Sequence, residues 1–90
     1  MRLSWTDSAS KHGVDRRDAL NAMLNYYVHV PVFDEPRAGR ATRPDLWIGP
    51  QRTLGAPLLE VMTEASASGL TVFHVMVARP KFLALLEEGE

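Results

Sequence analysis

The chain contains no cysteine among its 90 residues, which excludes a disulfide scaffold, a thiolate metal site and a cysteine nucleophile. A small domain without such crosslinks suits a reducing compartment, so we expect a cytoplasmic protein. Long apolar runs are also missing, because the longest, 72–78, is interrupted by His74 and is too short to span a bilayer. The N-terminus shows no apolar signal segment. The sequence therefore predicts no contact with a membrane.

An excess of charge of one sign is also lacking, because ten basic and eleven acidic residues give a formal net charge of −1. That balance argues against a generic basic nucleic-acid binder. The layout is uneven, however, because Glu87, Glu88 and Glu90 supply three of the acids, and the rest of the chain is net positive. Eight of the ten basic residues are arginine, which is suited to bidentate contacts with phosphate or carboxylate. A local phosphate-binding surface is compatible with this pattern.

The length suits a single domain over residues 1–90 with one modest core. Turn and capping signals predict two helices near the N-terminus. A short one lies between Arg2 and His12 and ends at Gly13, and a longer one is capped by Asp15. The longer helix carries an apolar stripe at helical spacing. Its members are Ala19, Leu20, Met23, Leu24 and Tyr27.

The rest of the chain alternates between apolar and polar residues in short runs. This alternation predicts strands at residues 26–33, 46–49, 58–63 and 70–78. Pro31 cannot donate to a sheet, which indicates an edge strand, whereas the last strand is apolar on both faces and fits the sheet interior. Pro80 begins a short C-terminal helix. The sequence predicts a small α+β domain with a mostly antiparallel sheet of three to four strands, two N-terminal helices and a short C-terminal helix.

One face of the last strand should carry both Val72 and His74, because strand side chains alternate. The segment 34–44 contains two prolines, one glycine and almost no apolar residue, which predicts a poorly ordered loop. The expected core combines the helical stripe with the strand faces. Its members are Leu20, Met23, Leu24, Val28, Val30, Leu59, Val61, Phe73, Val75 and Leu85.

Two stretches of the chain carry motifs of a known kind. The first contains Trp-Thr-Asp at 5–7 and Lys-His-Gly-Val at 11–14, followed by the longer predicted helix. The second, 73–82, reads Phe-His-Val-Met-Val-Ala-Arg-Pro-Lys-Phe. Together they resemble the start and the last strand of BrnT-like toxins, small bacterial ribonuclease toxins of type II toxin–antitoxin systems with a RelE-like fold. Val77 stands where that family has serine, so the chain resembles a divergent member.

The resemblance implies a metal-independent endoribonuclease that cleaves RNA to inhibit translation and is neutralised by a cognate antitoxin. The implied antitoxin is a ribbon-helix-helix dimer, and operator DNA would be bound only through it. No cofactor is implied. The near-neutral charge and the missing serine favour an alternative, a non-catalytic protein- or RNA-binding module of the same fold.

Metal-independent RNA cleavage needs a base for the 2′-hydroxyl proton, an acid for the leaving oxygen and cations for the charge that develops on phosphorus. Histidine suits the proton transfers, and arginine and lysine suit the charge. The catalytic candidates are therefore Arg79, Lys81, His74 and His12. Because Arg79 and Lys81 flank Pro80, we expect them beside free helix N–H groups that attract phosphate. Since Arg79 should then be exposed, its removal should barely affect stability.

Simpler interpretations of the same residues stay open. Arg79 and Lys81 would then be solvated cations, His74 a core residue and His12 part of a turn. The candidates for RNA binding are Lys11, Arg52, Arg37, Arg40 and Arg43. For the loop and turn arginines, plain solvation is the simpler account. The three histidines, including His29, occur at unrelated spacings, and no metal site is expected.

Overall fold

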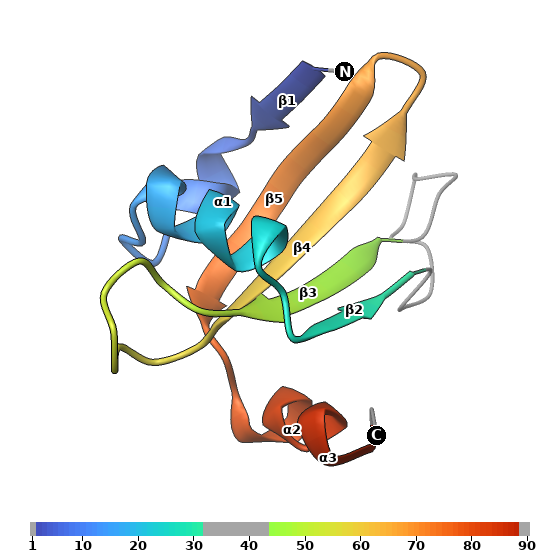
Figure 1. Ribbon diagram of the computed structural model, residues 1–90. Coiled ribbons are helices and arrows are strands. Elements are labelled where there is room, and N and C mark those ends of the chain that lie inside the picture. Colours follow the sequence, from blue (N-terminus) through green and yellow to red (C-terminus); the bar gives the residue numbers. More distant parts are fainter. Residues whose placement is uncertain (1, 32–43, 89–90) are drawn as a thin grey trace.

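The chain was analysed as a computed structural model that describes residues 2–31 and 44–88. The expected loop arginines, Arg37, Arg40 and Arg43, lie outside the described residues. Figure 1 shows the order of the elements along the chain. They are β1 Arg2–Trp5, the 3-10 turn η1 Asp7–Ser10, α1 Arg16–Leu24, β2 Val28–Val30, β3 Asp45–Gly49, β4 Leu59–Ser66, β5 Gly69–Val77, α2 Pro80–Leu83 and α3 Leu85–Glu88. Within the described ranges, no helix is long and apolar enough to span a membrane.

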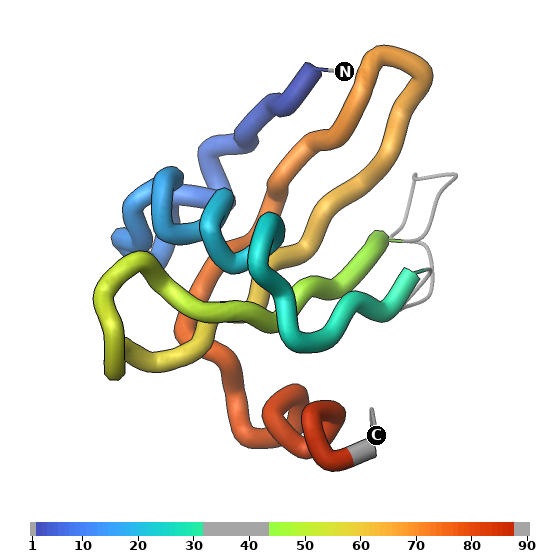
Figure 2. The backbone as a smooth tube through the Cα atoms, viewed as in Figure 1, coloured from blue at the N-terminus to red at the C-terminus, as the bar shows by residue number. Residues whose placement is uncertain are grey.

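The strands form one five-stranded sheet in the order β1-β5-β4-β3-β2. β1 runs parallel to β5, and the other three pairs are antiparallel, so the sheet is mixed. Figure 2 shows the N-terminal segment lying alongside the last strand. The predicted sheet of three to four mostly antiparallel strands is therefore wrong. β2 lies at a sheet edge and β5 in the interior, as Pro31 and the apolar pattern had predicted.

The N-terminal segment is the source of the error. β1 has only four residues, too few for alternation to distinguish a strand from an irregular lead-in. Its hydrogen-bonding partner is also remote in sequence, because Arg2 pairs with Gly69. After β1 the chain forms only the single turn η1 instead of a first α-helix. That turn stays on β5, since the Ser8 hydroxyl donates to the carbonyl oxygen of Phe73 at 2.6 Å.

The longer N-terminal helix begins where predicted. The Asp15 carboxylate caps α1 by accepting a hydrogen bond from the backbone N–H of Arg17 at 2.7 Å. The helix packs on the sheet through small residues, since Ala19 and Ala22 are fully buried. Because the alanine side of α1 faces the sheet, the larger residues of the predicted stripe lie to one side of the contact. Leu20 and Leu24, both expected in the core, are therefore exposed.

The sheet has a hydrophobic cluster on each face. Under α1 the cluster contains Ala19, Ala22, Met23, Leu59, Val61, Val72 and Val75. The opposite face packs beneath α2 and α3, and its cluster contains Leu46, Ile48, Met62, Phe73, Ala78 and Phe82. Val28, Val30 and Leu85 are partly buried against this second cluster. The other five expected core residues are buried, namely Met23, Leu59, Val61, Phe73 and Val75. Figure 1 shows α1 over the sheet and the C-terminal helices at one end.

Gly49 provides a test of the packing of α1 on β3. A methyl group at this position would collide with the backbone carbonyl of Ala22. We therefore expect Gly49→Ala to lower the free energy of unfolding by about 2–3 kcal/mol, as overpacked sites do. In thermal unfolding the midpoint should fall by roughly 10 °C or more for a domain of this size. Gly55→Ala is the control, because Gly55 has a φ of 84° but faces open space. Gly55→Ala should lower the free energy of unfolding by only about 1–2 kcal/mol, because alanine is strained in the left-handed region. A loss as large as that of Gly49→Ala would contradict the packing argument.

Candidate active site

A β-bulge in β5 determines which way His74 points. Met62 of β4 lies opposite His74, whereas the next residue, Thr63, lies opposite Val72. β5 thus has one extra residue, and the alternation of its side chains shifts by one position. His74 therefore leaves the α1 face, where Val72 packs, and joins the face that carries Glu60. The expectation that Val72 and His74 share a face is wrong because the register shift cannot be read from the sequence pattern.

Glu60 is the second residue of β4, lies opposite Met76 of β5 and is fully buried. Its Oε1 accepts hydrogen bonds from the backbone N–H of Arg79 at 2.9 Å and from Nε of Arg79 at 3.0 Å. Its Oε2 accepts from Nη2 of Arg79 at 2.7 Å and lies 2.8 Å from Nε2 of His74. A carboxylate buried in the sheet is thus satisfied by one guanidinium, one backbone amide and one imidazole.

The electrostatics of this group follow from the same contacts. Burial would raise the pKa of the Glu60 carboxyl, but the hydrogen bonds from Arg79 and His74 outweigh it and hold the pKa below its ordinary value. The hydrogen bond to Glu60 in turn raises the pKa of Arg79. Both partners reach the surface, since the side chain of Arg79 is 39% exposed and that of His74 is 19% exposed. The buried acid therefore holds two partly exposed basic groups.

His12 lies beside His74 at the edge of this cluster. The two ring centroids are 5.9 Å apart and the planes meet at 75°. η1 carries His12 to this place, because the turn is bound to β5 and the chain then reverses at Gly13, whose φ is 73°. The sequence-predicted pair of histidines is thus brought together by segments 62 residues apart in the chain.

The two predicted cations near the end of β5 meet at one aromatic ring. The guanidinium carbon of Arg79 lies 5.0 Å from the centroid of the Phe82 ring, and Nζ of Lys81 lies 4.9 Å from it. The expected helix N-terminus contributes little, because α2 has only four residues and the backbone N–H of Arg79 is already bound to Glu60. Positive charge at this place comes from side chains and not from helix N–H groups.

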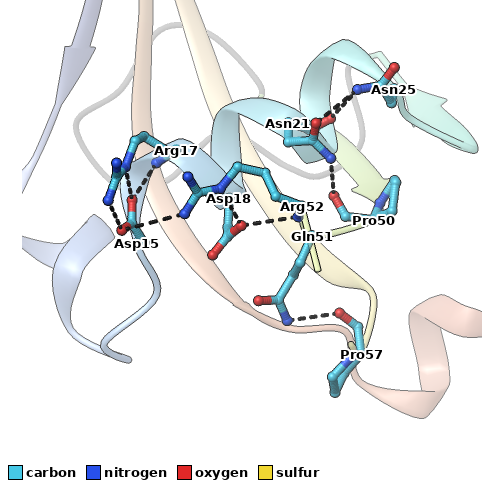
Figure 3. A network of polar contacts seen from close by, with 9 residues as sticks. All are labelled: Asp15, Arg17, Asp18, Asn21, Asn25, Pro50, Gln51, Arg52 and Pro57. Atoms are coloured by element: carbon cyan, nitrogen blue, oxygen red, sulfur yellow. Dashed lines mark hydrogen bonds and ion pairs between the residues drawn. The ribbon is translucent and has the colours of Figure 1, made fainter. Parts of the chain in front are cut away.

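Arg52 belongs to a different polar network (Figure 3). Its Nε donates to Asp18 at 2.8 Å, its backbone N–H donates to the same oxygen at 3.0 Å, and Nη2 lies 3.7 Å from Asp15. Arg17 also donates to Asp15, and its side-chain hydrogen bond, with help from Arg52, lowers the pKa of Asp15 to about 2. The network ties the turn over residues 50–57 to the start of α1. We therefore assign Arg52 a structural contact that the sequence does not reveal.

His29 forms a second carboxylate–imidazole pair, distinct from that of His74. Its Nε2 lies 2.9 Å from Oδ2 of Asp45, and its ring stacks on Trp47 with centroids 3.8 Å apart. His29 belongs to β2 and Asp45 to β3, so this pair lies at the edge of the sheet away from β5. Over residues 2–31 and 44–88, no three groups of the kind that bind metals come together.

The structure therefore brings together four of the predicted site residues and adds one that sequence reasoning missed. His12, His74, Arg79 and Lys81 surround Glu60 or its direct partners. Lys11 is exposed next to His12. In the sequence, Glu60 is the one acid within the predicted strand 58–63, and an acid in a strand ordinarily faces solvent. Its one signal is its position between Leu59 and Val61 in a strand whose other central residues are apolar. Comparisons with protein-family models, curated proteins and solved structures give no match.

The Arg79–Glu60 contact overturns the expectation that Arg79 can be removed without effect on stability. Without Arg79, Glu60 would remain buried with His74 as its main partner. We expect Arg79→Ala to lower the free energy of unfolding by about 2–3 kcal/mol, less than for a fully buried pair because Arg79 is partly exposed. Replacement of the exposed Lys81 by alanine should lower the free energy of unfolding by less than about 0.5 kcal/mol. Urea unfolding at neutral pH measures both, and equal small losses would contradict the role given to Arg79.

The same carboxylate makes stability depend on pH. Because the pKa of Glu60 in the folded chain lies below its ordinary value, the unfolded chain binds this proton more strongly. The contribution is complete above the unfolded pKa and is lost as the pH falls through the lowered folded pKa. The difference in unfolding free energy between the parent and Glu60→Gln should thus be constant near neutrality and shrink below about pH 4.3, the ordinary pKa of a glutamate side chain. A difference that stays constant through the acid range would show that Glu60 is not ionised.

Proposed function

We propose that this protein is a metal-independent endoribonuclease whose proton-transfer groups are His12 and His74. The observation that carries the proposal is the contact of these two imidazoles, at 5.9 Å between centroids, beside an arginine held by a buried carboxylate. Two imidazoles can act as the base and the acid, and a cation can stabilise the charge on phosphorus, when RNA is cleaved through its own 2′-hydroxyl.

The chemistry balances with the groups that are present. One neutral imidazole takes the proton of the 2′-hydroxyl, and the 2′-oxygen forms a bond to phosphorus. The other imidazole, protonated, gives its proton to the 5′-oxygen as the bond from phosphorus to that oxygen breaks. The products are a 2′,3′-cyclic phosphate and a free 5′-hydroxyl, and the net proton change on the protein is zero.

Arg79 and Lys81 supply the positive charge that this reaction needs. Glu60 accepts hydrogen bonds from Nε and Nη2 of Arg79, which leaves the two N–H groups of Nη1 outside that pair. Lys81 is exposed and contacts the same Phe82 ring as Arg79. Both cations can therefore contact phosphate oxygens while Arg79 stays bound to Glu60, and Lys11 adds a third cation beside His12.

A biological role as a toxin rests on the resemblance to BrnT-like toxins and on this chemistry together. We propose that the enzyme acts in the cytoplasm, cleaves RNA and so inhibits translation. A cognate antitoxin, a ribbon-helix-helix dimer, would neutralise it by covering the basic groups around His12 and Arg79, and operator DNA would be bound only through that partner.

The test uses a single-stranded RNA oligonucleotide of mixed sequence, labelled at both ends, in buffer with EDTA. The parent should cleave it, leave a matched all-deoxy oligonucleotide intact and produce cyclic phosphate ends. His12→Ala and His74→Ala should each reduce cleavage by about 10²–10⁴-fold, the usual contribution of acid–base catalysis. His29→Ala is the matched control, because it removes a histidine that is bound to a carboxylate elsewhere, and it should retain cleavage.

Two results would overturn the proposal. Cleavage that both histidine variants retain would place the reaction elsewhere or in a contaminant. RNA bound in a salt-dependent manner without any product would instead support the alternative, an RNA-binding module. Growth on expression provides an independent readout, because a ribonuclease toxin should arrest growth and His12→Ala should relieve the arrest at equal protein level.

A further inference from the structure

We infer that Glu60 is a positioning residue of the proposed ribonuclease: it fixes the proton of His74 on Nε2, presents Nδ1 to the substrate, and does not itself take the substrate proton. This inference rests on the proposed function for its catalytic part. Its structural part, the protonation pattern of His74, stands by itself. A buried acid between a histidine and an arginine would otherwise be an obvious candidate for the general base, so the distinction decides the mechanism.

The hydrogen bonds of Glu60 leave it no capacity for a substrate hydroxyl. Oε1 accepts two hydrogen bonds from Arg79, and Oε2 accepts from Nη2 and, at 3.2 Å, from Nε of Arg79 and contacts His74. A carboxylate offers about four lone-pair sites, so both oxygens are saturated. The side chain also has no exposed surface. A base must come within hydrogen-bonding distance of the proton that it removes, and Glu60 cannot do so in this arrangement.

The contact with Glu60 determines which nitrogen of His74 is available. An ionised carboxylate can only accept, so the nitrogen that lies 2.8 Å from it must carry a hydrogen. The lone pair of the neutral ring is therefore on Nδ1, and in the cation the transferable proton is on the same atom. Nδ1 is thus the atom that exchanges protons with RNA, while Nε2 stays bound to Glu60 throughout the reaction.

The same carboxylate fixes Arg79. Two of its nitrogens donate to Glu60 and its backbone N–H donates to the same group, so the guanidinium is held at both ends. Nη2 of Arg79 and Nε2 of His74 both contact Oε2 of Glu60, so the guanidinium and the imidazole meet at one oxygen. One buried acid thereby sets the relative position of a proton-transfer group and a phosphate-binding group, and His12 completes the pair from the neighbouring turn.

Nitrogen NMR of the ¹⁵N-histidine-labelled parent tests the structural part without any substrate. The expected result is a slowly exchanging Nε2–H signal from His74 and, when the ring is neutral, an unprotonated Nδ1. The Glu60→Gln variant should exchange this proton faster. The matched control is Asp45→Asn, which removes one negative charge from the contact with His29 and should leave the His74 signal unchanged. A neutral His74 with its proton on Nδ1 in the parent would overturn the inference.

Cleavage of the labelled RNA oligonucleotide across a range of pH tests the catalytic part. Glu60→Gln should reduce kcat/KM by on the order of 100-fold through misplacement of His74 and Arg79, yet keep the shape of the acid limb of the pH profile. Asp45→Asn should match the parent. If Glu60 were the base, Glu60→Gln would lose the acid limb and His12→Asn and His74→Asn would keep it, which overturns the inference while the ribonuclease proposal survives. A parent that does not cleave RNA refutes the proposed function, whereas the NMR result still decides the protonation of His74.

Discussion

One buried negative charge, the carboxylate of Glu60, constrains the whole end of the sheet near α2. A carboxylate removed from water is tolerated only when it is paired and hydrogen-bonded. His74 of β5 and Arg79, two residues after β5, must therefore both lie next to it. The bulge in β5 supplies the register for His74, and the end of the strand supplies Arg79. Because Arg79 is fixed, Pro80 starts α2 at a defined place and Phe82 enters the core. Strand register, helix direction and side-chain placement therefore depend on a single group.

Ion pairs determine how the charges behind the near-neutral net charge are distributed. Asp15 and Asp18 are occupied by Arg17 and Arg52, and Glu60 by Arg79. These acids neutralise cations locally instead of forming an acidic surface. Glu60 does so from inside the sheet, so its partner still presents part of its side chain outward. A net charge of −1 therefore does not describe the local arrangement, in which Lys11 and Lys81 are exposed and Arg79 is partly exposed.

The sequence identified the parts of the structure that depend on local pattern. The cap at Asp15, the edge position of the strand before Pro31 and the interior position of β5 follow from nearest neighbours in the chain, and all were predicted correctly. The candidates His12, His74, Arg79 and Lys81 rested on residue chemistry and on the family resemblance. The sequence suggested that these four residues lie near one another, but it did not determine their arrangement.

What sequence reasoning missed depends on contacts between distant segments. β1 is too short to be recognised without its partner β5, and an extra residue in a strand leaves no mark on its apolar pattern. Glu60 was overlooked for a similar reason, because an acid between Leu59 and Val61 looks the same whether it faces water or is buried against an arginine. The exposure of Leu24 likewise follows from the rotation of α1 on its small residues, which periodicity does not determine.

The parallel pairing of β1 with β5 has a consequence for the order of events during synthesis. The two strands are separated by more than sixty residues, and η1, which carries the chain to His12, can settle only on a formed β5. Contacts of such long sequence separation are formed late and slowly. During synthesis, His12 therefore cannot reach its place beside His74 before β5 has been made and can fold. The contact between the two imidazoles depends on the last strand to be synthesised, although one of them lies near the start of the chain.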